Sequence, residues 1–122
     1  RSLESLLEGL YEPVESREFR LKILAEDFRA AGTAVLDSLA EYAKEQPGWS
    51  IAPDNCEGVR VNLDKAHGDG WFLLRLSLHD PILPLNIESD REHGARTIAR
   101  QLAPFLAQQV NIDASSALEF TL

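Results

Sequence analysis

Cysteine is almost absent from this chain. Cys56 is the only one among 122 residues, so no disulfide can form within the chain. No zinc-like spacing surrounds Cys56, and His67 and His93 lack acidic companions at metal-ligand spacing, so we predict no metal site. Scarce cysteine is typical of proteins from a reducing compartment. We therefore expect a cytoplasmic location.

Long apolar runs are absent as well. A membrane-spanning helix needs about 18 consecutive apolar residues, and no such run occurs here. The chain has no signal-peptide pattern, so we expect neither a membrane partner nor export. It also lacks an initiating Met and opens at Arg1, which indicates a segment excised from a longer protein. We therefore expect other domains to precede it in a parent chain.

Basic residues are fewer than acidic residues in this chain. There are 12 Lys and Arg against 20 Asp and Glu, and the formal net charge is −8 at pH 7. No basic block or aromatic platform offsets this charge, so we predict no binding to nucleic acid or to anionic lipid. A small anion stays acceptable as a ligand. Charges beyond a Debye length of about 8 Å are largely screened, so a local Arg dominates its own site.

The length and the 44% hydrophobic content suit one domain with a single core. Before it, leucines recur at helical spacing between Ser2, a credible cap, and Pro13. This pattern predicts a connector helix over residues 1–14, the domain itself over 15–110 and a C-terminal tail over 111–122. The tail is expected to be loop-like, with a strand or a frayed end at 118–122.

Apolar residues at period two predict strands, and apolar residues at helical spacing predict helices. Asp90 is expected to cap the last helix, and Pro104 to kink or divide it. The predicted strands are 19–23, 59–63, 71–76 and 83–88, and the helices are 26–45 and 90–108. This order suits an α+β fold, in which helices pack on one face of an antiparallel sheet of about four strands.

A tight turn between the last two predicted strands carries the most chemistry. Asp80-Pro81 marks the turn, whose backbone N–H groups can converge on an anion. Arg75 enters from the first strand, and its guanidinium can hold two phosphate oxygens at once. Ser77 and His79 add side-chain donors, so the turn is predicted to bind phosphate. Trp71, at the start of the same strand, is expected in the core.

These residues resemble the C-terminal domain of the alpha-D-phosphohexomutases, the phosphoglucomutase and phosphomannomutase superfamily. That domain has Gly-Trp, then Arg-x-Ser-Asn-Thr-Glu-Pro, then Leu-Arg-Leu. The segment from Glu57 to Val61 resembles the family's Asp-Gly-Val-Arg strand, and the resemblance extends from about Leu3 to Leu106. The matching turn positions are Gly70, Trp71, Arg75, Ser77, Pro81, Leu83 and Leu85.

Four positions depart from the family pattern: Leu78 replaces Asn, His79 replaces Thr, Asp80 replaces Glu and Pro84 replaces Arg. Leu78 still offers a backbone N–H, as any residue except Pro does. His79 replaces a permanent hydroxyl donor by an imidazole whose charge depends on pH, which favours phosphate binding at lower pH. Pro84 lacks a backbone donor, so we expect an edge or bulged strand there.

The resemblance implies a fold like half of the TATA-binding protein and a phosphate-binding site made by Arg75, Ser77, Leu78 and His79. It implies no catalytic residue in this chain, because the family's serine loop, Mg²⁺ loop and sugar-hydroxyl loop have no counterpart here. The parent would be an isomerase, an intramolecular phosphotransferase that interconverts glucose or mannose 1-phosphate and 6-phosphate with Mg²⁺ as cofactor. This domain would hold the phosphate that does not react.

Simpler interpretations stay open for each site residue. Arg75 also suits a surface ion pair, Ser77 a local cap of the turn, and His79 an exposed loop position. The departures at Leu78, His79 and Pro84 suit a non-catalytic binding or interaction module that keeps the fold but has lost phosphate binding. A nucleic-acid binder, suggested by the fold alone, conflicts with the negative net charge.

Overall fold

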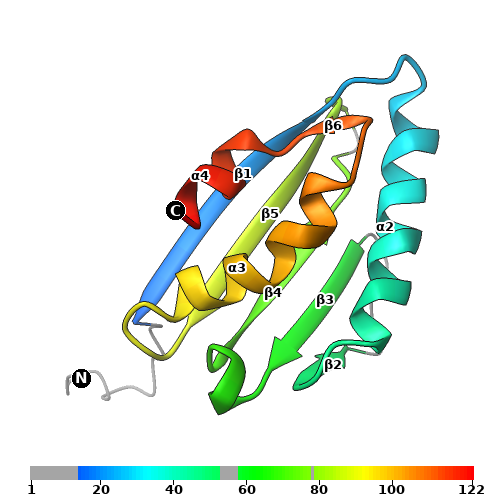
Figure 1. Cartoon of the computed structure of the whole chain (residues 1–122). Helices are drawn as coiled ribbons and strands as arrows, with labels where there is room; N and C mark the ends of the chain where they lie inside the picture. Colours follow the sequence, from blue (N-terminus) through cyan, green and yellow to red (C-terminus); the bar gives the residue numbers. More distant parts are fainter. Residues whose placement is uncertain (1–13, 53–57, 78) are drawn as a thin grey trace, which may run out of the picture.

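The structure is a computed structural model that describes residues 14–52, 58–77 and 79–122. All but the last residue of the predicted connector helix, together with Cys56, Glu57 and Leu78, lie outside the described residues. Figure 1 shows the described elements, which are β1 (Glu15–Ile23), α2 (Phe28–Lys44), β2 (Trp49–Ile51), β3 (Gly58–Leu63), the 3₁₀ helix η2 (Lys65–His67), β4 (Gly70–Arg75), β5 (Ile82–Ser89), α3 (Gly94–Ala107), β6 (Ile112–Asp113) and α4 (Ser115–Phe120).

The strands form one antiparallel sheet of six strands in the order β2-β3-β4-β5-β1-β6. The expected α+β class is confirmed, but the expected number of about four strands is wrong. The additional strands β2 and β6 are three and two residues long and lie at the two edges of the sheet. Such short segments carry no readable alternation of apolar and polar residues, so the sequence pattern misses them.

The helices cover one face of the sheet, as predicted (Figure 1). In β1, Leu21 and Ile23 are buried under this helical layer, whereas Arg20 and Lys22 are exposed on the opposite face, hereafter the back face. The core lies between the helices and the sheet. The buried sheet residues that fill it are Leu21, Ile23, Val59, Val61, Leu63, Phe72, Leu74, Leu83, Leu85, Ile87 and Ile112.

Helix α2 lies within the range predicted for it. Its start is set by Asp27, whose carboxylate accepts a hydrogen bond of 3.2 Å from the N–H of Ala30. Val35, Leu39 and Ala43 recur at helical spacing and are buried. Within the described part of the chain, no helix has both the length and the apolar character needed to cross a membrane.

Helix α3 buries the apolar face predicted for it, but its start differs from the prediction. The N–H groups of His93 and Ala95 donate to the carboxylate of Glu15 at 2.8 and 3.0 Å, so the first residue of β1 caps the helix instead of Asp90. The predicted division at Pro104 is also wrong, because α3 continues through it. Pro104 lies on the exposed side of the helix, where the packed opposite face keeps the chain helical.

Strand β5 lies between β4 and β1, so the edge or bulged position expected for Pro84 is wrong. Pro84 pairs in regular register with Arg20 of β1. Its nitrogen faces β4, because the carbonyl of Ile82, two residues earlier, accepts a 3.1 Å hydrogen bond from Ser77 on that side. The regular β4–β5 pairing ends at Leu85, and the bond from Ser77 to Ile82 lies beyond Pro84, so the missing N–H of Pro84 leaves one gap between these segments.

The C-terminal residues are structured, whereas a loop-like tail was expected. β6 pairs with the end of β1, and α4 packs on α3 and β1. The ring of Phe120 in α4 lies 5.5 Å from that of Phe19, and the guanidinium groups of Arg17 and Arg96 lie over it. The expected strand or frayed end at 118–122 is therefore wrong. Burial of Ala117 and the contacts of Phe120 favour a helix over the weak alternation in the sequence.

Candidate functional site

The turn between β4 and β5 is closed by hydrogen bonds within the chain. The N–H of Ser77 donates to the carbonyl of Ile82 at 3.1 Å, and the N–H of Ile82 donates to the carbonyl of Asp80 at 2.8 Å. The hydroxyl oxygen of Ser77 accepts from the N–H of Asp80 at 3.3 Å. Ser77 therefore caps the turn, as its simpler interpretation holds, and its hydroxyl proton is left to donate to a ligand.

The other predicted site residues differ in how well the turn positions them. Leu78 lies outside the described residues. His79 and Asp80 are exposed. Of the described turn residues that have a backbone N–H, His79 is the one whose N–H makes no hydrogen bond with another described residue. The predicted group of free backbone donors is therefore reduced, because the N–H groups on either side close the turn.

Arg75 is the last residue of β4 and pairs with Gly58 of β3. Side chains alternate between the two faces along a strand, and those of Phe72 and Leu74 are buried in the core. Arg75 therefore lies on the back face, away from the core. Its side chain is half-buried and makes no ion pair or hydrogen bond with any other described residue. The surface ion pair offered as its simpler interpretation is therefore not formed with a described residue.

Strand register brings further cations to the same end of the back face. Arg20 of β1 pairs with Pro84 of β5. The last β4–β5 pair joins Leu74 and Leu85, so the same register continued by one residue places Arg75 of β4 on the other side of Pro84. Lys22 follows Arg20 on β1 and pairs with Ile82. We call this group, Arg20, Lys22 and Arg75 with Ser77 and His79, the basic end of the sheet.

Besides the exposed Asp80 of the turn itself, two carboxylates on the neighbouring strands moderate the charge of the basic end. Glu18 lies 4.0 Å from Arg20, and both side chains are mostly exposed, so this pair is weak. Asp113 pairs with Lys22 across β1 and β6. The hydroxyl and the N–H of Ser115, with a smaller contribution from Lys22, lower the pKa of Asp113, which is therefore ionised at neutral pH. Arg75 is the cation furthest from these two acids in the strand order.

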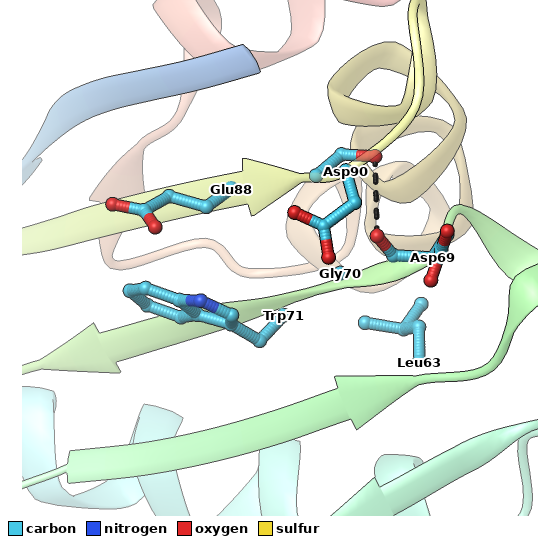
Figure 2. Close-up of a pocket in the computed structure, with 7 residues that line it drawn as sticks. Leu63, Asp69, Gly70, Trp71, Glu88 and Asp90 are labelled. Atoms are coloured by element: carbon cyan, nitrogen blue, oxygen red, sulfur yellow. Dashed lines mark hydrogen bonds between the residues drawn. The ribbon is translucent and has the colours of Figure 1, made fainter. Parts of the chain in front are cut away.

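The opposite end of the sheet is acidic and contains a small pocket of about 160 Å³. Figure 2 shows the carboxylates of Glu88 and Asp90 beside Trp71, with Asp69 across from them. The N–H of Asp90 donates to the carbonyl of Asp69 at 2.9 Å, which ties the loop after β5 to the loop before β4. We call this region the acidic end. Its like charges repel a phosphate.

Ser89 forms the buried wall of that pocket and is the one buried polar side chain among the described residues, 1% exposed. Its hydroxyl donates to the carbonyl of Gly68 and accepts from the N–H of Arg91 at 3.1 Å. A Cβ at Gly94 would collide with this hydroxyl, so glycine is needed where α3 begins. These contacts hold together the two loops and the helix start, and no sequence motif indicates them.

Trp71 lies on the back face and not in the core as predicted. Phe72 and Leu74 take the core positions of β4, so Trp71 points the other way and lines the pocket. The guanidinium of Arg60 lies 4.1 Å from the centre of its ring, within the range of a cation–π contact. Among the residues that the structure describes, no three or more His, Cys, Asp or Glu gather in a way that would hold a metal ion.

Comparisons with known proteins identify no family. No family model matches the chain. No curated protein sequence matches it significantly either. Its two sheet ends are therefore interpreted from their own geometry, which gives one end fit for an anion and one end that repels it.

Proposed function

We propose that the basic end binds the phosphate group of a hexose phosphate, glucose or mannose 1-phosphate or 6-phosphate. The observation that carries this proposal is Arg75, a half-buried arginine beside a hydroxyl-bearing turn, engaged by no other described residue. A guanidinium in this state is available to take two phosphate oxygens. Ser77 adds its hydroxyl, and His79 adds its backbone N–H and its imidazole.

We further propose that the chain is the C-terminal domain of a phosphohexomutase, with a fold like half of the TATA-binding protein. The sequence of strand, helix, successive antiparallel strands and helix supports this assignment, as does the turn between two central strands. The parent enzyme would act in the cytoplasm, and its Mg²⁺ would bind a loop outside this chain.

In that role the domain supplies positioning, not chemistry. Arg75 and Ser77 would hold the phosphate that does not react, which orients the sugar toward the reacting group elsewhere in the parent. Binding energy from this remote group that is present in the transition state lowers the barrier measured from free enzyme and free substrate. Loss of Arg75 should therefore lower kcat/KM.

A direct test measures binding to the 122-residue chain. Glucose 6-phosphate is titrated into the ¹⁵N-labelled protein, with glucose as the neutral counterpart, and amide shifts are followed at Ser77 and His79. We expect saturable shifts with the phosphate alone, and a loss of affinity of at least about tenfold in Arg75→Gln. The matched control is Arg96→Gln, because Arg96 is an exposed arginine on α3 whose Nε donates to the carbonyl of Phe120.

The same pair of variants in the full-length parent tests the wider proposal. Turnover on glucose 1-phosphate and mannose 1-phosphate should fall in Arg75→Gln and stay unchanged in Arg96→Gln. Binding without turnover in the wild-type parent would leave phosphate recognition but reject the mutase. Absence of phosphate-dependent shifts would instead support the alternative that the departures at Leu78, His79 and Pro84 favour, a non-catalytic module that keeps the fold.

A further inference from the structure

A second cavity, of about 560 Å³, lies in the helical layer and not on the back face. Its walls are the C-terminal end of α2 with Tyr42, the turn after it with Pro47, the 3₁₀ helix η2 with His67, and the outer side of α3 with Arg100 and Pro104. Figure 1 shows α2 and α3 on the same face of the sheet. This volume falls within the range of about 300–1,000 Å³ that is usual for small-molecule sites.

The polar groups in and next to the wall of this open cavity already bond to one another. The side-chain amide of Gln101 donates to the carbonyls of His67 and Thr97 at 2.6 and 3.1 Å, and its oxygen accepts from the indole N–H of Trp49 at 2.9 Å. The hydroxyl of Tyr42 donates to the carbonyl of Gln101 at 3.0 Å. A ligand would therefore meet a fixed inner wall that consists of Gln101 and the ring of Tyr42.

The ionisable side chains that line the cavity are cationic or neutral. Among the residues that the structure describes, no Asp or Glu lines it, although the whole chain has 20 of them. Arg100 is held in place because its Nε donates to the carbonyl of Thr121 at 2.9 Å, which leaves its terminal nitrogens for another acceptor. Burial raises the pKa of Tyr42, so its phenol stays neutral at physiological pH.

His67 adds a second hydrogen-bonding group. Its Nδ1 lies 2.5 Å from the carboxylate of Asp64, so this nitrogen is already engaged and Nε2 is left for a ligand. Pro104 contributes an apolar surface, and it has no N–H to donate to the carbonyl of Arg100 four residues before it. The cavity thus combines apolar walls, one permanent cation and one imidazole.

We propose that this cavity binds a small organic carboxylate with a flat apolar body. One permanent charge on Arg100 matches a single negative charge, whereas a phosphate dianion would need more cations than the lining supplies. The apolar body would pack against Tyr42, Pro47 and Pro104. This site goes beyond the proposed function, because it is built from the helical layer and shares no residue with the basic end.

The test titrates 2-naphthoate into the ¹⁵N-labelled 122-residue protein, with 2-naphthamide as the uncharged counterpart. The indole N–H signal of Trp49 reports on the cavity through its bond to Gln101, and that of Trp71 reports on the back face as an internal reference. We expect 2-naphthoate to shift the Trp49 indole and the Gln101 amide saturably. The amide should bind at least about tenfold more weakly, because it lacks the charge that Arg100 pairs with.

Matched variants assign the charge to Arg100. Arg100→Gln should weaken 2-naphthoate binding about tenfold or more, and Arg96→Gln, one turn earlier on the same helix and outside the cavity, should leave it unchanged. His67→Asn should have a smaller effect. Equal binding of acid and amide, equal binding in both arginine variants, or shifts confined to the Trp71 signal would each overturn the proposal. Retained amide dispersion in each variant shows that it folds.

Discussion

Where β4 begins, a buried serine holds two loops and a helix start together, whereas past the end of β4 a half-buried serine holds a single turn. Ser89 is 1% exposed and its hydroxyl connects Gly68 with Arg91. Ser77 is partly exposed, and its hydroxyl oxygen accepts one bond of 3.3 Å from Asp80. The buried hydroxyl at the acidic end thus bonds within the fold, whereas the hydroxyl at the basic end is partly exposed.

This difference separates structural from functional polarity within one sheet. A buried hydroxyl that bonds to backbone groups has no capacity left for a ligand, and its loss leaves those groups unsatisfied. A cation such as Arg75, engaged by no other described residue, adds little to stability and is open to a partner. Substitutions at the two ends should therefore have opposite consequences for stability and for binding.

The largest expected effect separates the two serines. Ser89→Ala should lower the free energy of unfolding by about 2 kcal/mol, because the Gly68 carbonyl and the Arg91 N–H lose a buried partner. Ser77→Ala should cost about 0.5 kcal/mol and should weaken phosphate binding. Urea denaturation measures both values, and the exposed Ser50→Ala in β2 serves as the control. Equal losses at the two positions would remove the distinction between the ends.

A smaller effect is expected at Glu15, which joins the acidic end of β1 to α3. Burial acts to raise the pKa of this carboxyl, but the hydrogen bonds from His93 and Ala95, with the charges of Arg17 and His93, lower it overall. Because the pKa is lower in the folded state, the carboxylate stabilises the protein fully at pH values above 4.5, the ordinary pKa of a glutamate that the unfolded chain retains. This contribution is lost as the pH falls through the folded-state pKa.

Glu15→Gln should therefore lower stability by about 1 kcal/mol at neutral pH and reduce the loss of stability in acid. Chemical denaturation across pH 3 to 7 measures this profile. Glu26→Gln is the matched control, because Glu26 is an exposed carboxylate in the loop before α2. A wild-type profile that is flat in acid would contradict the capping role of Glu15.

The smallest effect concerns the like charges of the acidic end. Asp90→Asn should raise stability by about 0.5 kcal/mol at low ionic strength, because it removes one of three carboxylates around the pocket while the backbone bond to Asp69 remains. The gain should disappear in high salt, where surface charges are screened. Thermal unfolding at two salt concentrations measures it. A loss of stability at low salt would indicate that Asp90 has a favourable partner.

Local periodicity was enough to predict α2, α3 and four of the six strands, but not α4. Val35 and Leu39 in α2 repeat within the element that they stabilise, so the sequence window contains the information. The cap of α3 could not be found in this way, because Glu15 lies 78 residues from His93. The prediction that Trp71 lies in the core was wrong for another reason. The run from Trp71 to Leu74 is apolar throughout, so either face of the strand fits the core until the sheet is assembled.

In the candidate site, too, local features were predicted from the sequence and long-range neighbours were not. The positions of Arg75 and Ser77 at the end of one strand follow from the turn motif and its flanking apolar runs. Their neighbours Arg20 and Lys22 come from the pairing of β1 with β5, which no short window reveals. His67 belonged to no predicted site, and its pairing with Asp64 depends on the short 3₁₀ helix between β3 and β4.

The place of β1 in the sheet also determines the order in which the protein can form during synthesis. β1 is made first, yet its partners β5 and β6 are residues 82–89 and 112–113. During synthesis, the apolar side chains of Leu21 and Ile23 therefore remain without a partner strand, whereas β2, β3 and β4 can pair in succession as they leave the ribosome. We expect nascent chains that stop before β5 to depend on chaperones and to aggregate without them.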